Sequence, residues 1–245
     1  MNIYPRPTLW LSILFLTAVI AGDASAQNPS KKNSSFQLLP FKVKLDTVLE
    51  HDDGKSLWFQ PRVAVVPGLG KNGQPTVFLT LQKLLGRSDY FSGLSVMRTN
   101  DMGKSWSEPD LRPELEWVHQ GKIDIAVADV TPDWHPQTAK VIAIGAQVRY
   151  SVDGHQLEDI KRAHQTAYAV LDPKSEKWTK WQQIKMPDDE QFNFARSACG
   201  QFLVEPDGSL LLPFYIGKDA KTPWSITVAR FSFDGTQLKY IEHGN

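Results

Sequence analysis

Arg62 is the first residue whose type and position suit chemistry. It stands in the apolar run RVAVV, and a guanidinium is costly to bury unless an anion pairs with it. Its planar fork of N–H groups fits a carboxylate in two-point fashion. A bound ligand can supply that anion, or an acidic residue of a neighbouring element can supply it in a purely structural pair. The residues alone leave both interpretations open.

Asp89 is the second candidate, as a general acid. Tyr90 and Phe91 follow it directly, and apolar surroundings raise the pKa of a carboxyl group towards the range that proton transfer requires. The alternative interpretation is a solvated loop carboxylate that caps a turn.

A third carboxylate, Asp101, lies in the stretch TNDMGKSW between two strand-like runs. Aspartate accepts nearby backbone N–H groups and glycine tolerates positive φ, so Asp and Gly here indicate a hairpin turn. Trp106 is then expected to pack its ring across the hairpin. We therefore interpret the set Thr99, Asp101, Gly103 and Trp106 as structural.

The turn has weaker echoes at Asp172 and Asp234, which follow at intervals of 71 and 62 residues. Each period holds about four strand-like runs, the fourth run of the first period lying near Trp106, and four-stranded sheets that repeat are typical of propeller blades. We predict an all-β chain with blades at about 57–110, 120–186 and 192–245. Because three blades do not close a ring, we expect either the N-terminal half of a longer protein, which we favour, or half of a dimeric ring.

The N-terminus predicts export. Residues 9–22 form one apolar run behind Arg6 and lead to the small-residue signal Ala24-Ser25-Ala26, the pattern of a secretory signal peptide over 1–26. A polar leader (27–45) precedes the predicted propeller (46–245). The mature protein is expected to be secreted or periplasmic, with no membrane attachment.

Composition excludes several classes of function. Lys plus Arg and Asp plus Glu both number 27, so the basic excess that nucleic-acid binding requires is missing. The six histidines show no metal-ligand spacing, and Cys199 has no second cysteine to pair with. We predict neither a metal site nor a cofactor.

The stretch Thr99–Trp106 resembles the Asp-box, S/T-x-D-x-G-x-T/S-W, of the sialidase (neuraminidase) superfamily, and the resemblance covers most of residues 57–245. In that family the complete fold is a six-bladed propeller. Asp-boxes lie at turns between the third and fourth strands of a blade, away from the active site. Phe59–Ala64 (FQPRVA) resembles the family's R-x-P strand, with the proline before the arginine. Arg62 would then grip the substrate carboxylate.

Other segments are similar to family patterns as well. Gly86-Arg87-Ser88-Asp89 resembles the segment that carries the acid/base aspartate, which implies that Asp89 is catalytic and that Arg87 and Tyr90 contact substrate. Residues 199–215 resemble the third-blade pattern, which would point Gln201 into the channel. His135, beside Asp133, and Arg196 lie near strand ends and are candidate site-lining residues, although a hydrogen-bonded loop histidine is the favoured interpretation of His135.

The resemblance implies an exo-glycosidase whose partner is a glycan that ends in sialic acid or a similar acidic sugar. The family's nucleophilic tyrosine, its activating glutamate and two further arginines belong to later blades, so this chain by itself is expected to be inactive. The alternative is a non-catalytic propeller that binds glycans or proteins.

Overall fold

A computed structural model describes residues 40–86, 89–157, 165–197, 201–219 and 221–244. Backbone contacts divide the chain into two units, Met1–Leu45 and Asp46–Asn245. Of the first unit only 40–45 are described, as exposed chain without regular structure. The predicted signal peptide, Arg87 and Cys199 lie outside the described residues. Within the described part, no helix combines the length and apolarity needed to cross a membrane.

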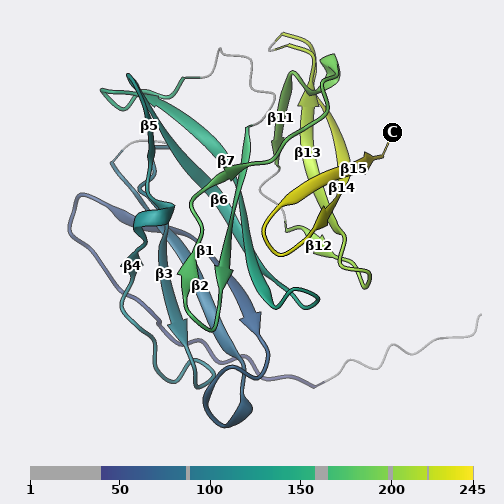
Figure 1. Cartoon of the computed structure of the whole chain (residues 1–245). Helices are drawn as coiled ribbons and strands as arrows, with labels where there is room; N and C mark the ends of the chain where they lie inside the picture. The colour runs from purple at the N-terminus through teal and green to yellow at the C-terminus, as the bar shows by residue number, and fades with distance from the viewer. Residues whose placement is uncertain (1–39, 87–88, 158–164, 198–200, 220, 245) are drawn as a thin grey trace, which may run out of the picture. The chain divides into compact units, whose positions relative to one another are not determined.

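The first sheet contains four antiparallel strands in chain order: β1 (Leu57–Val66), β2 (Thr76–Leu84), β3 (Ser95–Thr99) and β4 (Asp110–Leu111) (Figure 1). The fourth strand begins later than the position near Trp106 that the sequence predicted. Ser107 already donates its N–H to the carbonyl of Arg98, but Pro109 has no N–H with which to continue the ladder. Regular pairing with β3 resumes only at Asp110.

The second sheet is the largest and follows the order β10-β8-β7-β6-β5, with β9 also paired to β8. Its strands are β5 (Val118–Gln120), β6 (Ile123–His135), β7 (Lys140–Ser151), β8 (Thr166–Asp172), β9 (Lys177–Trp178) and β10 (Gln182–Gln183). The short β5 was not predicted. It forms a tight hairpin with β6, in which Gly121 takes the positive φ of 62° that the turn requires.

The third sheet follows the order β11-β13-β14-β15, with β12 also paired to β13. Its strands are β11 (Phe194–Ser197), β12 (Leu203–Val204), β13 (Leu210–Gly217), β14 (Ser225–Phe233) and β15 (Leu238–His243). Three 3₁₀ turns complete the described secondary structure: η1 (Lys71–Gly73), η2 (Pro113–Leu115) and η3 (Glu190–Phe192). The described part contains no α-helix, as expected for an all-β chain.

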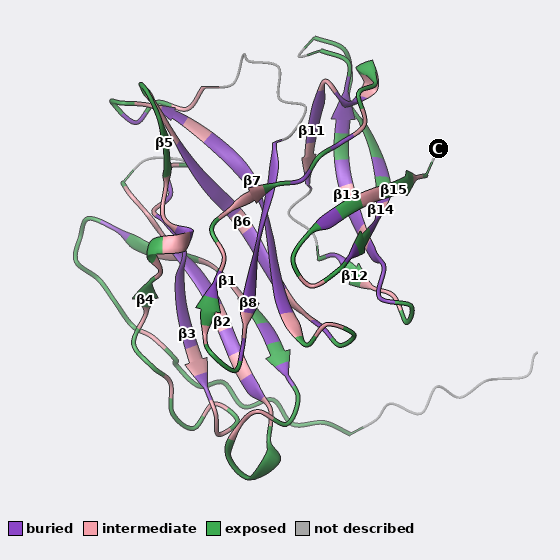
Figure 2. Ribbon diagram, in the orientation of Figure 1, coloured by how far each residue is buried: buried purple, intermediate pink, exposed green. Residues whose placement is uncertain are grey.

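The second sheet is covered on both faces, which Figure 2 shows as the buried strands β6, β7 and β8. Along β7, Val141 and Ala143 join a core cluster with side chains of the first sheet, such as Phe78. The alternate residues Ile142 and Ile144 join a second cluster with side chains of the third sheet. A strand that is apolar on both faces needs a layer on each side, and the three sheets therefore stack face to face.

The recurring aspartates occupy equivalent turns. Asp101 lies between β3 and β4, Asp172 ends β8 before β9, and Asp234 lies between β14 and β15. Each carboxylate accepts hydrogen bonds from backbone N–H groups that follow it: Ser105 at 2.9 Å, Lys174 and Ser175 at 3.0 and 3.2 Å, Thr236 and Gln237 at 2.9 and 2.8 Å. We call these the three Asp turns.

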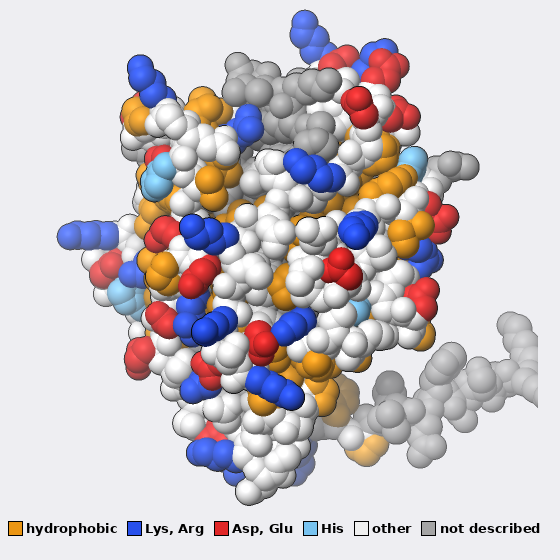
Figure 3. All heavy atoms as spheres, in the orientation of Figure 1, with side chains coloured by type: hydrophobic (Ala, Val, Ile, Leu, Met, Phe, Trp, Pro, Cys, Tyr) orange, Lys and Arg blue, Asp and Glu red, His pale blue; other side chains and the backbone are white. Residues whose placement is uncertain are grey.

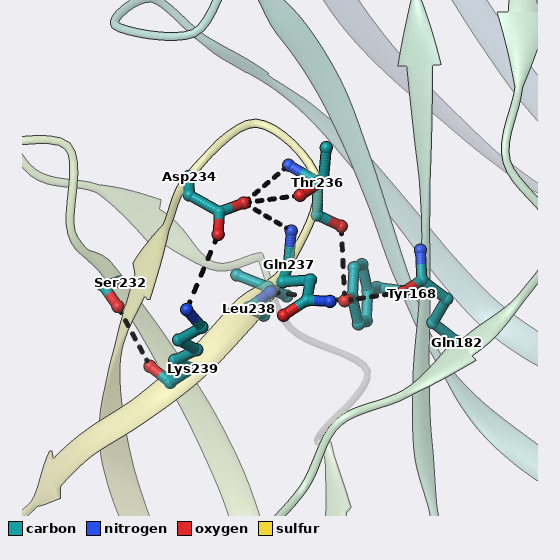
Figure 4. Close-up of polar contacts among 8 residues, drawn as sticks. All are labelled: Tyr168, Gln182, Ser232, Asp234, Thr236, Gln237, Leu238 and Lys239. Atoms are coloured by element: carbon teal, nitrogen blue, oxygen red, sulfur yellow. Dashed lines mark hydrogen bonds and ion pairs between the residues drawn. The ribbon is translucent and has the colours of Figure 1, made fainter.

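The Asp turns gather at one end of the stacked sheets. Arg98, just before the first turn, forms an ion pair with Glu176 of the second turn. The Tyr168 hydroxyl, on β8, accepts the N–H of Leu238 just after the third turn, and the carbonyl of Thr236 lies at 3.5 Å from the same hydroxyl oxygen (Figure 4). The starts of β3, β6 and β8 therefore lie at the other end of the sheets, away from the Asp turns, and we call this the opposite end.

The face of the molecule drawn in Figure 3 mixes charges of both signs. Figure 3 shows acidic and basic side chains interspersed over the face drawn, with hydrophobic side chains between them. This distribution agrees with the formal net charge of zero, and it differs from the basic stripe typical of nucleic-acid-binding proteins.

The Asp turns predict a loss of stability in acid. Hydrogen bonds from Ser105, Lys140 and Thr236, each supported by backbone N–H groups, lower the pKa values of Asp101, Asp172 and Asp234 from 3.8 to about 2. Because the folded pKa is lowered, this stabilisation is present above pH 3.8 and is lost as the pH falls through about 2. Thermal unfolding followed by circular dichroism should show the midpoint falling over that interval.

Single variants test the assignment. Asp234→Asn should lower the unfolding temperature by a few degrees at neutral pH and flatten its dependence on pH below 3.8. The control is Asp188→Asn, because Asp188 is exposed and makes no hydrogen bond with a described residue. An Asp234→Asn variant with the wild-type temperature and acid profile would contradict the role of the turn.

Candidate functional site

Strands β1, β6 and β11, one from each sheet, bring their polar side chains together, and we call them the inner strands. Two of them are interrupted by bulges: the register of β1 shifts between Phe59 and Arg62, and that of β6 between Ala128 and Thr131. Bulges often redirect side chains beside functional sites. Here they determine where Gln60 and Asp129 point.

Both bulge residues have a left-handed backbone, with φ of 53° at Gln60 and 54° at Asp129. This conformation is uncommon for residues other than glycine and persists only when the surroundings enforce it. Two hydrogen bonds join the pair. Gln60 Nε2 donates to Asp129 Oδ1 at 2.5 Å, and the backbone N–H of Asp129 donates to Gln60 Oε1 at 2.8 Å. These two hydrogen bonds join the first sheet to the second at the bulges of β1 and β6.

Arg196 on β11 brings the third sheet to the same point. Its Nη2 lies 3.7 Å from Asp129 Oδ2, and the two side chains are 30% and 18% exposed. Gln60, Asp129 and Arg196 thus form an inner-strand cluster, with one residue from each sheet, which solvent can reach.

Arg62 follows the β1 bulge and is partly buried. Its backbone carbonyl accepts a weak hydrogen bond of 3.4 Å from Thr80. Its guanidinium forms no ion pair with any residue that the structure describes. The structural interpretation, a pair with an acid of a neighbouring sheet, is therefore not found among the described residues.

Asp89 lies in the loop between β2 and β3 at the opposite end, and it is exposed, with a φ of 53°. Its backbone carbonyl accepts a hydrogen bond of 2.5 Å from the Tyr150 hydroxyl, which in turn accepts the N–H of Phe91 at 3.3 Å. Burial raises the pKa of Tyr150 to about 12. The sequence predicted apolar surroundings for Asp89. In the structure these surroundings enclose Tyr90 and Phe91 instead, while Asp89 is exposed.

Tyr90 and Trp117 hold this loop against the second sheet. The Tyr90 ring lies 5.0 Å from the ring of Tyr150 and 5.5 Å from that of Trp117. Trp117 Nε1 donates to the carbonyl of Phe91 at 2.9 Å. The result is a partly exposed aromatic cluster beside Asp89, at the same end as the start of β6.

His135 lies elsewhere, at the Asp-turn end of β6, and is 1% exposed. Its Nδ1 lies 2.8 Å from Thr138 Oγ1 and its Nε2 lies 2.8 Å from the carbonyl of Gly208. It therefore joins the second and third sheets as the hydrogen-bonded histidine that the sequence favoured. On the same strand, burial raises the pKa of Asp133. Gln201 is exposed between β11 and β12.

Sequence reasoning missed Gln60, Asp129 and Tyr150. Asp129 gave the same signal as Arg62, since it is a charged residue inside an apolar strand, IDIAVADV. Gln60 and Tyr150 gave no comparable signal. No cluster of three or more His, Cys, Asp or Glu side chains in the described part of the chain could hold a metal ion.

Comparison by sequence finds no matching family model and no matching characterised protein. Comparison of structures finds an intramolecular trans-sialidase from leech, in complex with 2,7-anhydro-Neu5Ac, with a TM-score of 0.52 and 11% identity. The match covers 82% of this chain and 46% of the leech protein. The NanB sialidase of Streptococcus pneumoniae matches with a TM-score of 0.48 and 10% identity, over 83% of this chain and 55% of NanB.

At 11% identity, the match to the leech trans-sialidase is evidence for the fold alone. The chain is an all-β protein whose antiparallel sheets have the blade arrangement of a sialidase-like β-propeller. It spans about half the length of the two proteins that it matches.

His135 yields a stability prediction. His135→Ala should lower the free energy of unfolding by about 2 to 3 kcal/mol, because it leaves the buried Gly208 carbonyl without its donor and removes a well-packed ring. Urea unfolding measures the change. The control is Gln137→Ala, which removes an exposed hydrogen bond of 2.9 Å to the Pro206 carbonyl and should cost less than about 1 kcal/mol. Equal effects of the two variants would contradict the bridging role.

Proposed function

We propose that this chain is the substrate-binding, N-terminal part of a secreted exo-glycosidase of the sialidase superfamily, which removes a terminal sialic acid or a similar acidic sugar from glycans. One observation carries the proposal. The partly buried guanidinium of Arg62 has no ionic partner among the described residues, and it lies two residues along β1 from Gln60 of the inner-strand cluster.

The charges near the inner strands favour an anionic ligand. Asp129 faces Arg196, so that pair is close to neutral, and Arg62 adds a positive charge that lacks a counter-ion in the described part. A ligand carboxylate would offer it a two-point, charge-assisted contact. Such contacts are stronger at partly buried positions than in bulk water.

The loop at the opposite end provides the remaining groups. Asp89 is proposed to protonate the leaving group, and the Tyr90–Trp117 pair offers aromatic faces on which a sugar ring can stack, with Arg87 as a further contact to substrate. In the superfamily, a tyrosine activated by a glutamate attacks the anomeric carbon. We place that pair in later blades of a longer protein, so the chain by itself is proposed to bind without hydrolysing. The apolar run at 9–22 supports export to the periplasm or the medium.

One observation favours a second candidate, a non-catalytic propeller that binds glycans. Asp89 is exposed, and the apolar side chains of its loop do not enclose its carboxyl group. In this alternative, Arg62 and the aromatic cluster still bind sugar, and Asp89 only shapes the loop.

The parent protein, with any blades that follow in the same reading frame, tests the choice. It should release the fluorophore from a fluorogenic sialoside. Arg62→Ala should lower kcat/KM by an amount that corresponds to about 3 kcal/mol of lost transition-state stabilisation, because a bidentate contact is lost. The control is Arg230→Ala, since Arg230 pairs with Glu242 on the third sheet. Binding of sialosides without turnover would favour the second candidate, and inertness in both assays would reject both.

A further inference from the structure

Tyr150, near the end of β7, joins the loop between β2 and β3 to the second sheet. Its side chain is 1% exposed, and its hydroxyl contacts the loop backbone on both sides of Tyr90. The hydroxyl donates to the carbonyl of Asp89 at 2.5 Å and accepts the N–H of Phe91 at 3.3 Å. Because a tyrosine hydroxyl both donates and accepts, one side chain holds the loop backbone at two nearby points.

Asp89 needs such an anchor because its backbone is strained. Its φ is 53°, a left-handed conformation that residues other than glycine keep only when the surroundings enforce it. The loop itself provides one hydrogen bond across its base, from the N–H of Leu85 to the carbonyl of Tyr90 at 2.8 Å. The Tyr150 hydroxyl provides a contact at Asp89 itself. The direction in which the Asp89 side chain leaves the backbone thus depends on a group of the neighbouring sheet.

The Tyr150 hydroxyl also lies between the loop and the inner-strand cluster. Burial raises the pKa of Tyr150 to about 12, although the hydrogen bond from Phe91 opposes the rise. The charge of Asp89 raises the pKa further and the charge of Arg196 lowers it, so both groups are close enough to act on one oxygen. At neutral pH the hydroxyl therefore keeps its proton, which makes it a hydrogen-bond donor to the loop and a poor nucleophile.

We propose that Tyr150 is a positioning residue that holds the Asp89 carboxyl group where it can protonate the leaving group. The inference rests on the proposed function, in which Asp89 is the general acid. Tyr150 acts through the loop backbone and touches no reacting atom. A general acid must lie about 2.6 to 3.2 Å from the atom that it protonates, and a displacement of about 1 Å can cost about 100-fold in rate. An exposed carboxyl group on a loop without this anchor would meet that requirement for only part of the time.

Amide hydrogen exchange of the mature chain tests the anchor. Tyr150→Phe keeps the ring, which lies 5.0 Å from the ring of Tyr90, and removes only the hydroxyl. The N–H of Phe91 then loses its acceptor and should exchange at least about 10-fold faster. The matched control is Tyr168→Phe on β8 of the same sheet, because the Tyr168 hydroxyl accepts the N–H of Leu238 at the Asp-turn end. This control should leave the exchange of Phe91 unchanged.

The anchor can also be measured without a variant. In a crystal structure of the wild type, the Tyr150 hydroxyl oxygen should lie within hydrogen-bond distance of the Asp89 carbonyl oxygen and of the Phe91 nitrogen. A Tyr150 hydroxyl that contacts neither group would overturn the inference, as would an unchanged exchange rate of Phe91 in Tyr150→Phe.

The parent protein tests the effect on catalysis, with two substrates that carry the same sialic acid. The phenolic leaving group of 4-methylumbelliferyl sialoside departs with little help from an acid, whereas the sugar hydroxyl that leaves from sialyllactose needs a proton. Tyr150→Phe should therefore lower kcat/KM for sialyllactose at least about 10-fold and for the phenolic substrate by much less. The Kd for free N-acetylneuraminic acid should stay within about 2-fold, because it has no leaving group. Tyr168→Phe should change none of these values.

A double variant shows whether Tyr150 acts through Asp89. Because Asp89→Asn removes the acid, adding Tyr150→Phe to it should cause no further loss of kcat/KM on sialyllactose. Equal losses on both substrates, or additive losses in the double variant, would make Tyr150 a purely structural residue. Either result would overturn the inference and leave the proposed function standing. A wild type that cleaves neither substrate would reject the proposed function and, with it, the role assigned to Tyr150.

Discussion

Burial of the second sheet on both faces is the constraint on which the rest of the structure depends. Strand β7 is apolar at successive positions, so its side chains enter a core on each side. The first and third sheets must each turn a face towards it, and their inner strands then meet β6. Other faces keep apolar side chains in solvent, among them Val63 and Val65 on β1 and Ile226 on β14, which are 50%, 46% and 70% exposed.

The stacking separates the groups that shape the chain from those that we propose to contact a ligand. The three Asp turns and His135 lie at one end, where their polar atoms are bonded to backbone or to neighbouring sheets. Asp89 and the aromatic cluster of Tyr90 lie at the opposite end. A carboxylate whose acceptor sites are filled by turn N–H groups has little capacity left for proton transfer, so the most conspicuous motif in the sequence shapes the turn.

The inner-strand cluster has features that cost folding free energy. Two residues hold a strained backbone, and a charged pair is kept partly out of water without a direct hydrogen bond. A cluster that served stability alone would be replaced at little loss by apolar side chains. Together with the guanidinium of Arg62, which forms no ion pair with a described residue, the arrangement supports the proposal that an anionic ligand binds at the inner strands.

The sequence by itself determined the all-β class, the spacing of the Asp turns and the approximate strands, because turns and strands depend on backbone preferences and on side chains close together in the chain. It also marked Arg62, through its charge in an apolar run. The tertiary structure alone decided that Gln60 and Arg196 meet Asp129, since 69 and 67 residues separate these partners in sequence and only the stacking of three sheets, with a bulge in two strands, brings them within reach.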